Sequence, residues 1–347
     1  MRRILLVIAL LLSVSTVFAA KYAGEFLEIG VGARALGMGG SMTSHVDDGS
    51  AFYWNPSGAS YISGVRFSGM YADLWDGLAN YSVAGVSLPV TGSVFSINWL
   101  RLGVPDIELH PDYAELLQQD QFQRYVVRDG DTTYYNSVQE YLLATGGAPE
   151  GFFSDGESAI FLSFSKLNSF TIDLGWSYFQ IPMELPIGAS VKIINHKIGN
   201  TTGTGIGADF GAQFRFPLDM IVHEYWKAKL AYGFTWQDAT RTAIDWGENN
   251  KDAIPPNFRS GVSLLQKLPG KNNEILLSYD TEKRWERTRH LGVEYNMAKV
   301  LSLRGGFWGE DWTAGAGISI WQATVDYAYL SKEIGVTHRV SFSLRIR

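Results

Sequence analysis

The chain has 347 residues, a formal net charge of −6, 37 glycines, 11 tryptophans, 17 tyrosines, 19 phenylalanines and no cysteine. The absence of cysteine excludes a disulfide-stapled fold and thiolate chemistry. The acidic balance makes nucleic acid an unexpected partner, and the net charge becomes −8 once the two arginines within the first 19 residues are removed.

The first 19 residues have the parts of a secretory signal peptide. Arg2 and Arg3 form the positive region, residues 4–17 form the apolar region, and Val17-Phe18-Ala19 suits cleavage before Ala20. The apolar run is shorter than the roughly 20 residues that a permanent membrane-spanning helix needs. The sequence therefore predicts an exported protein with a signal peptide at 1–19.

Residues 20–64 are expected to form a plug segment ahead of the first strand. They include the sequences FLEIGVGARALGMGG, starting at Phe26, and DDGSAFYWNPSG, starting at Asp47. Small residues at this density let backbone pack against backbone. Asp47 or Asp48 can cap a short helix, after which Pro56 redirects the chain. The residues singled out for the plug and its turn are Arg34, Asp47, Asp48, Trp54, Asn55 and Pro56.

From about Phe170 to the C-terminus, segments of about ten residues alternate between apolar and polar or small side chains. In residues 206–216, Ile206, Ala208 and Phe210 alternate with Gly207 and Asp209. A soluble sandwich alternates too. These segments, however, exceed the usual strand length of about 5–6 residues, and aromatic side chains lie at the ends of their apolar faces. This pattern is typical of a transmembrane β-barrel, with its apolar face toward lipid and its polar face toward the lumen.

We predict an all-β protein whose barrel, at 65–347, is a 14-stranded antiparallel transmembrane β-barrel with the plug segment in its lumen. Bacterial single-chain barrels have an even number of strands, short periplasmic turns and longer outer loops. The predicted strands are 65–74, 81–90, 93–102, 169–179, 187–196, 205–216, 226–236, 256–265, 273–281, 288–296, 300–308, 312–320, 322–330 and 337–346.

Residues 103–168 are predicted to form a long acidic extracellular loop. Residues 103–157 hold eleven acidic and only two basic residues. The apolar stretch 158–166 competes for a place in the wall, but strict up–down alternation assigns it to the base of this loop. Ser137 and Glu140 have capping-box spacing, which predicts a helix ending near Gly146. The loop is expected to face solvent, a basic protein, or divalent cations that bridge lipopolysaccharide.

Charged residues on the predicted lumen faces permit two interpretations. They can line a water path or bind an anionic head group, or they can pair across neighbouring strands and fill the barrel. Lys227 and Lys229 lie on one face and are the favoured candidates for holding a carboxylate. The candidate ligand contacts are Lys192, Asp209, Arg215, Lys227 and Lys229, and Glu294 and Arg304 are predicted to face the lumen as well.

No motif indicates an enzyme, a cofactor or a metal site. Gly30-Val31-Gly32 has the wrong spacing for a dinucleotide loop and lacks a βαβ context. The six histidines are scattered, and His223-Glu224 has no HExxH context. A Gly-x-Ser-x-Gly elbow is absent from the sequence.

The N-terminal motif resembles the FadL superfamily of outer-membrane proteins, most closely its PorV/PorQ-like branch. The resemblance lies in IGVGARALGMGG at residues 29–40, the acidic pair Asp47-Asp48 and YWNPSG at residues 53–58, where Ser57 replaces the family's alanine. It implies a fourteen-stranded barrel of the bacterial outer membrane whose N-terminal segment enters the lumen. The expected surroundings are outer-membrane lipid and lipopolysaccharide.

The resemblance implies two functions. FadL-type members let hydrophobic small molecules such as fatty acids or hydrocarbons diffuse through a plugged barrel. PorV-type members act in type IX secretion, where they receive or shuttle secreted proteins at the cell surface, so secretion-machinery proteins are possible partners. Passive uptake of a hydrophobic ligand is the leading expectation, and the secretion role is the alternative.

Overall fold

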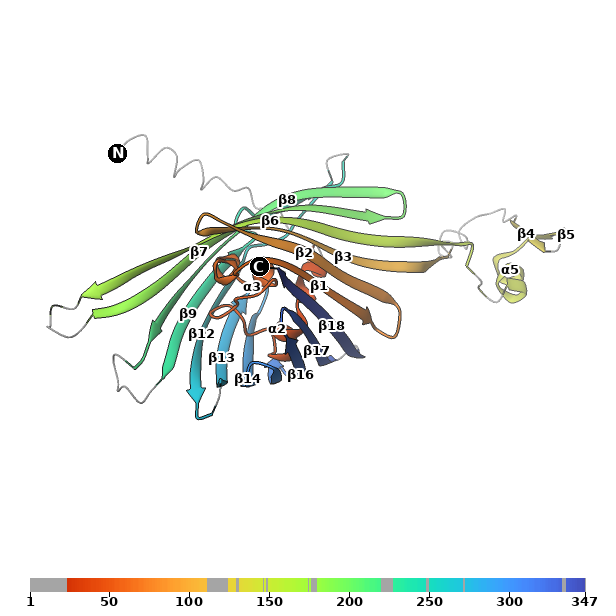
Figure 1. Ribbon diagram of the computed structural model, residues 1–347. Helices are drawn as coiled ribbons and strands as arrows, with labels where there is room; N and C mark the ends of the chain where they lie inside the picture. The colour runs from red at the N-terminus through yellow and green to blue at the C-terminus, as the bar shows by residue number, and fades with distance from the viewer. Residues whose placement is uncertain are drawn as a thin grey trace, which may run out of the picture.

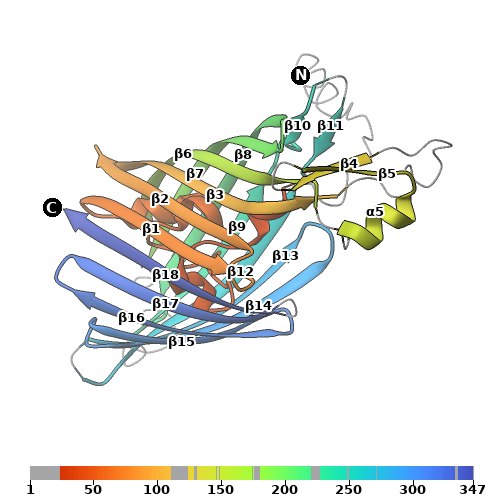
Figure 2. The same ribbon diagram turned by 90° about the vertical axis from the view of Figure 1, so that its right-hand side faces the viewer.

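The computed structural model describes residues 24–110, 124–128, 131–145, 147, 149–173, 175, 180–219, 227–247, 250–270, 272–332 and 335–346. The predicted signal peptide at 1–19 lies outside the described residues. Within the described ranges, fourteen strands pair with their neighbours, all antiparallel, into a closed barrel (Figures 1 and 2). Closure comes from the first and last strands, with Val65 opposite Ile346 and Asp73 opposite His338. The fold is therefore the predicted 14-stranded antiparallel transmembrane β-barrel.

The wall strands follow one another in chain order around the barrel. Their bounds are β1 Val65–Leu74, β2 Ala79–Val90, β3 Ser93–Leu109, β6 Gly151–Asp173, β7 Gln180–Ile198, β8 Thr201–Pro217, β9 Ala228–Gln237, β12 Asn257–Leu268, β13 Asn273–Lys283, β14 Arg287–Met297, β15 Leu301–Trp308, β16 Asp311–Ile320, β17 Ala323–Lys332 and β18 Gly335–Ile346. We call the end at which β18 finishes the short-turn end, and the opposite end the long-loop end.

The outer surface of the wall is apolar because the strands alternate as predicted. On β3, Phe95, Ile97 and Trp99 are exposed, whereas the intervening Ser96 and Asn98 are buried toward the lumen. Large hydrophobic side chains are exposed in the same way on most of the other wall strands. Soluble monomers rarely expose apolar patches of this extent, so lipid is the medium that this surface fits.

The assignment of 158–166 to the base of an extracellular loop was wrong. These residues are the middle of β6, which pairs with β3 on one side and β7 on the other. The connection between β3 and β6 is therefore 110–150, shorter than the predicted 103–168. Residues 169–173 are the end of β6 and not a separate strand, and most of 174–179 lies outside the described residues.

The long-loop end carries several small elements. The connection between β3 and β6 contains the hairpin β4 (Arg124–Arg128) and β5 (Asp131–Tyr135) and the helix α5 (Val138–Thr145), all beyond the ends of the wall strands (Figure 1). The predicted helix start is confirmed, because Ser137 Oγ accepts a hydrogen bond from the Glu140 backbone N–H at 3.1 Å. A second hairpin, β10 (Ala243–Asp245) and β11 (Lys251–Ala253), pairs with β8. Among the described residues, no helix combines the length and hydropathy needed to cross a bilayer.

The N-terminal segment, residues 24–64, lies inside the ring of strands (Figure 2). It forms four short helices, namely η1 (Glu25–Glu28), α2 (Ala33–Gly37), α3 (Ala51–Trp54) and η2 (Pro56–Tyr61). Its apolar side chains are the centre of the hydrophobic core, and Leu36, Met38, Met42 and Trp54 are fully buried. The core of this barrel is thus formed by the N-terminal segment together with inward-facing side chains of the wall strands.

Candidate functional site in the barrel lumen

The N-terminal segment runs through the lumen from one end of the barrel to the other. Near its start, Glu28 forms an ion pair with Arg284 of the turn after β13, at 3.1 Å and at the long-loop end. α2 then packs against β15 to β18, and η2 packs against β6 to β8 on the opposite side of the lumen. Gly64 reaches the backbone of Ile346 at the short-turn end, where β1 begins. The segment therefore spans both the length and the width of the lumen.

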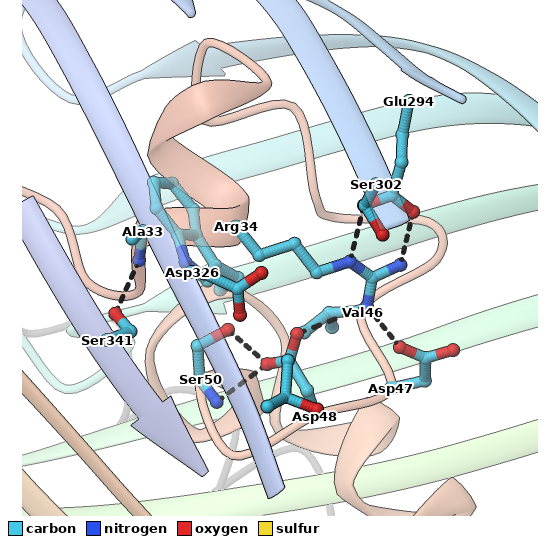
Figure 3. A network of polar contacts seen from close by, with 12 residues as sticks. Ala33, Arg34, Val46, Asp47, Asp48, Ser50, Glu294, Ser302, Asp326 and Ser341 are labelled. Atoms are coloured by element: carbon cyan, nitrogen blue, oxygen red, sulfur yellow. Dashed lines mark hydrogen bonds and ion pairs between the residues drawn. The ribbon is translucent and has the colours of Figure 1, made fainter. Parts of the chain in front are cut away.

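Arg34 ties the middle of the segment to the wall (Figure 3). Its guanidinium makes a bidentate contact with Glu294 of β14, with both N–O distances at 3.0 Å. The same group contacts Asp47 at 2.6 Å and Asp48 at 3.1 Å. Bidentate arginine–carboxylate pairs are strong and fix geometry. The motif residues Arg34, Asp47 and Asp48 thus meet in one network, although 13 residues separate Arg34 from Asp47.

The network continues along the wall through Arg304 of β15. Arg304 contacts Glu294 at 2.6 Å and Asp326 of β17 at 2.7 Å. Burial by itself lowers the pKa of Arg34, but Glu294, Asp47 and Asp48 outweigh burial and raise this pKa well above its usual value. Arg34 consequently stays charged. Along the lumen, positive and negative side chains therefore follow one another in direct contact, from Arg34 through Glu294 and Arg304 to Asp326. Glu294 and Arg304 were predicted to face the lumen, and this is confirmed.

The Trp54-Asn55-Pro56 turn makes backbone contacts with the far wall. The Asn55 amide donates to the carbonyl oxygens of Ala212 at 3.1 Å and Phe234 at 3.3 Å. The Trp54 indole donates to the Val31 carbonyl at 2.7 Å inside the segment. Pro56 is buried as the first residue of η2, where its missing N–H and fixed φ suit a helix start.

Glycines allow the segment and the wall to approach closely. Gly39 has a positive φ of 64°, and a Cβ there would lie 2.4 Å from the Phe307 carbonyl oxygen. From the wall side, a Cβ on Gly306 would lie 2.5 Å from the backbone carbon of Met38. The backbone of Met38 and Gly39, directly after α2, thus packs against the backbone of β15, as the density of small residues predicted.

Two cavities lie on either side of the packed segment. At the short-turn end, a cavity of about 380 Å³ is lined by the Arg34 network together with Arg66 and Arg345. At the long-loop end, a cavity of about 470 Å³ is lined by Tyr53, Trp285 and Trp308, and by the polar groups of neighbouring strands. The fully buried Trp54 and Met42 belong to the segment that separates the two ends. The lumen is closed in its middle and hollow at both ends.

Lys192 and Asp209 form an ion pair within a larger charged network that the sequence did not reveal. Their ion pair of 2.9 Å is buried, and Lys192 also contacts Asp238 of the loop after β9 at 2.7 Å. Asp238 in turn contacts Arg284 at 3.0 Å, which leads to Glu28 of the N-terminal segment. Both residues lie in the lumen as predicted, and their role as ligand contacts stays a prediction.

Arg215, Lys227 and Lys229 do not form one site with that pair. Arg215 stacks on Tyr61, with its guanidinium carbon 3.8 Å from the ring centroid, and donates to the Val46 carbonyl. Lys227 and Lys229 are exposed at the short-turn end, where Lys229 and Arg215 line a shallow cavity of about 340 Å³. The carboxylate-binding role of the two lysines stays a prediction.

Sequence reasoning missed a second charged cluster on the segment. Arg259 of β12 pairs with Glu282 of β13 and donates to the Gly40 carbonyl at 3.0 Å. His290 of β14 contacts the Gly39 carbonyl oxygen at 2.7 Å. Arg259 and Glu282 are direct partners in the strand register and share the inward face. The opposite charges of Arg259 and Glu282 are visible in the sequence. Recognising the two residues as a pair required the register between β12 and β13, which the sequence alone did not provide.

Comparisons with known proteins give likeness in overall shape only. No family model matches the chain, and no curated protein matches it. Among solved structures, the Ralstonia pickettii toluene transporter TbuX is 11% identical, with 92% of this chain and 99% of that chain covered and a TM-score of 0.47. A Pseudomonas aeruginosa FadL homologue is 10% identical, with 91% and 98% covered and a TM-score of 0.44. The TodX monoaromatic hydrocarbon channel is 8% identical, with 91% and 99% covered and a TM-score of 0.43.

The class of protein follows from the fold and the site. The closed wall, the apolar outer surface and the chain packed through the lumen define a transmembrane β-barrel with an occupied lumen. Within that class, the FadL superfamily and its PorV/PorQ-like branch stay a prediction that rests on the N-terminal motif.

Proposed function

We propose that this chain is a non-enzymatic integral barrel of the bacterial outer membrane that lets hydrophobic small molecules, such as fatty acids or hydrocarbons, pass by passive diffusion. One observation carries the proposal: the N-terminal segment closes the lumen between two cavities that open toward opposite ends. A solute that enters from the long-loop end can leave at the other end only when this segment moves. The segment is therefore the gate.

The long-loop cavity has the chemistry of a site for an amphiphile. Tyr53, Trp285 and Trp308 offer aromatic surface, and Arg259 and Arg284 offer guanidinium groups beside it. An apolar chain gains roughly 25 cal/mol for each Å² that it buries against these aromatic rings. The charged lining is mixed, because Arg259 and Arg284 already form ion pairs with Glu282 and Glu28, so the polar head of an amphiphile would meet groups of both signs there.

The gate is held by ionic contacts that can open without unfolding the wall. Arg34 bonds the segment to Glu294, whereas the wall is closed by the separate β1–β18 ladder. Loss of the Arg34 contacts leaves the ladder intact. We therefore expect changes at Arg34 to alter passage more than they alter barrel assembly.

Uptake into proteoliposomes tests the proposal. Vesicles that contain the protein should take up a fluorescent fatty acid faster than empty vesicles, and Arg34→Gln should change this rate. Arg101→Gln is the matched control, because Arg101 is exposed on the outward face of β3. Equal uptake by protein-containing and empty vesicles would sink the proposal.

A role in secretion or surface attachment is the alternative, and one observation favours it. The β4–β5 hairpin and α5 lie beyond the wall at the long-loop end, with Tyr134 and Leu143 exposed at 68% and 79%. Exposed apolar side chains on a projecting unit suit a protein partner. Native mass spectrometry of protein extracted gently from its own membrane separates the two functions. A bound fatty acid or hydrocarbon supports uptake, whereas a bound protein supports secretion.

A further inference from the structure

Three metal-ligating side chains meet at the long-loop end, outside the contacts that hold the N-terminal segment. Asp155 and Glu157 are two residues apart on β6, so they share its inward face. His196 on β7 is the direct register partner of Glu157. His196 Nε2 lies 2.7 Å from Glu157 Oε1 and 3.4 Å from Asp155 Oδ1. One ligand atom from each residue lies within 4.8 Å of the others.

These groups are short of partners. Glu157 and His196 are each only 8% exposed. Among the described residues, His196 Nδ1 has no hydrogen-bond partner, whereas His196 Nε2 lies within ion-pair distance of both carboxylates. No lysine or arginine among the described residues forms an ion pair with either carboxylate. Two neighbouring carboxylates repel each other, and the cation that the described residues offer them is a protonated His196, so a divalent ion in its place would compensate both charges.

The donor set selects one chemical class of cation. An imidazole nitrogen with two carboxylate oxygens suits zinc and neighbouring divalent transition metals, whereas calcium and magnesium prefer oxygen ligands alone. Bonds of about 2.0–2.2 Å in tetrahedral geometry place neighbouring donors about 3.3–3.6 Å apart. The 3.4 Å separation between His196 Nε2 and Asp155 Oδ1 lies within this range, and the 2.7 Å separation between His196 Nε2 and Glu157 Oε1 would have to widen on binding. We propose that Asp155, Glu157 and His196 bind a divalent transition-metal ion of the zinc class, with water completing its coordination.

The bound ion would join three parts of the barrel mouth. The ion itself links β6 to β7. The ring of Trp246, from the turn of the β10–β11 hairpin, packs on the His196 ring with centroids 4.9 Å apart. Fixing the imidazole by a metal bond thus also fixes the surface on which this hairpin rests. The site stabilises the hairpin where it lies against β8 at Gly205.

Zinc titration of the purified protein tests the proposal. The full-length barrel in detergent is treated with a chelator and titrated with ZnCl₂ in a calorimeter, and its Tm is measured with and without zinc. We expect one zinc ion per chain and a Tm that rises with zinc. Glu157→Gln keeps the shape of the side chain and should weaken binding by about 100-fold or more, as should His196→Asn and Asp155→Asn.

His338→Asn is the matched control, because His338 is exposed on β18 and contacts Tyr327. This variant should bind zinc like the unaltered protein. Circular dichroism confirms that each variant is folded, and the isosteric Glu157→Gln keeps the test decisive if His196→Asn fails to fold. Either no saturable binding by the unaltered chain or equal binding by Glu157→Gln overturns the site. Neither result bears on the uptake proposal, whose assay needs no metal.

Discussion

Asn55 shows how one side chain seats the N-terminal segment on the wall. Its amide group donates to the carbonyls of Thr43, Ala212 and Phe234, and its oxygen accepts from the Ser57 backbone and hydroxyl. Ser57 thereby gains a partner within its own turn. The close packing of this turn is kept because the Ser57 hydroxyl donates to Asn55 within the turn and needs no other partner.

Asn55→Ala is predicted to destabilise the protein by about 1–3 kcal/mol, because it leaves buried carbonyl oxygens without their donor. The measurement is the change in Tm in detergent. Asn195 is exposed on β7, so Asn195→Ala should stay within about 0.5 kcal/mol of the unaltered protein. Equal effects of the two substitutions would contradict the assigned role of Asn55.

His45 makes the stability of the packed N-terminal segment sensitive to acid. Burial, followed by the positive charge of Arg34, lowers the pKa of this histidine to about 3. Neither ring nitrogen has a hydrogen-bond partner among the described residues. An unfolded chain takes up the proton near pH 6.5, so between about pH 6.5 and 3 the unfolded state binds more protons. Stability is therefore lost as the pH falls through this window.

His45→Leu should remove this loss. The unaltered protein is predicted to lose up to about 1.4 kcal/mol per pH unit through His45 between pH 6 and 4, and the variant should show a shallower decline in Tm over the same range. Thermal unfolding followed by circular dichroism at several pH values gives both curves. Parallel curves would show that His45 is not buried in its neutral form.

At the scale of elements, the contact between α2 and β15 depends on which face of the strand a glycine occupies. Gly306 faces inward against Met38, whereas a Cβ on its neighbour Gly305 would meet nothing nearer than 3.9 Å. Gly306→Ala is predicted to lower the Tm by several degrees, because backbone must shift to admit the methyl group. Gly305→Ala is the matched control and should leave the Tm within a degree or two. A larger fall in Tm for Gly305→Ala than for Gly306→Ala would mean that the chain after α2 does not pack against Gly306.

The middle of β6, residues 158–166, was weighed as a wall strand and then given to a loop, because only that choice let strict up–down alternation place the long acidic connection on the outer side. Ala159 and Phe161 face the N-terminal segment, and Phe161 packs on Phe52 with ring centroids 4.9 Å apart. Ile160 and Leu162 face outward. Both faces are therefore apolar over residues 159–162, and the alternation of apolar and polar side chains returns only at Ser163 and Ser165. A strand pressed against the plug looks like a buried core strand when only the sequence is read.

The site was predictable only in part for a related reason. The inward direction of Lys192 and Asp209 follows from alternation along single strands. Their partners Asp238 and Arg284 lie in loops, and a loop's position depends on the pairing of strands far apart in sequence. The Arg34 network was likewise visible as a motif, but Glu294 could be matched to it only after the barrel had closed.

At the scale of the whole molecule, the N-terminal segment is predicted to set the conductance. Deleting residues 24–62 from the mature chain should leave the β1–β18 ladder in place and raise ion conductance in planar bilayers by about tenfold or more, since a water-filled lumen then connects the two ends. Replacing 110–150 by a short Gly-Ser linker is the control and should leave conductance low. Unchanged conductance after the deletion would mean that another part of the chain closes the lumen.

The wall is far from uniform in height. β6 has 23 residues and β15 has 8, which correspond to about 78 Å and about 27 Å along the strand. The shorter strand is slightly shorter than the hydrocarbon layer of about 30 Å, whereas β6 extends far beyond it, so the rim of the barrel is cut at a slant. The long-loop cavity, with Trp285 and Trp308, lies on the low side of that rim. Under the proposed uptake function, an amphiphile dissolved in the outer leaflet would enter the cavity across this low part of the rim, at the depth of the lipid headgroups and without first passing into water.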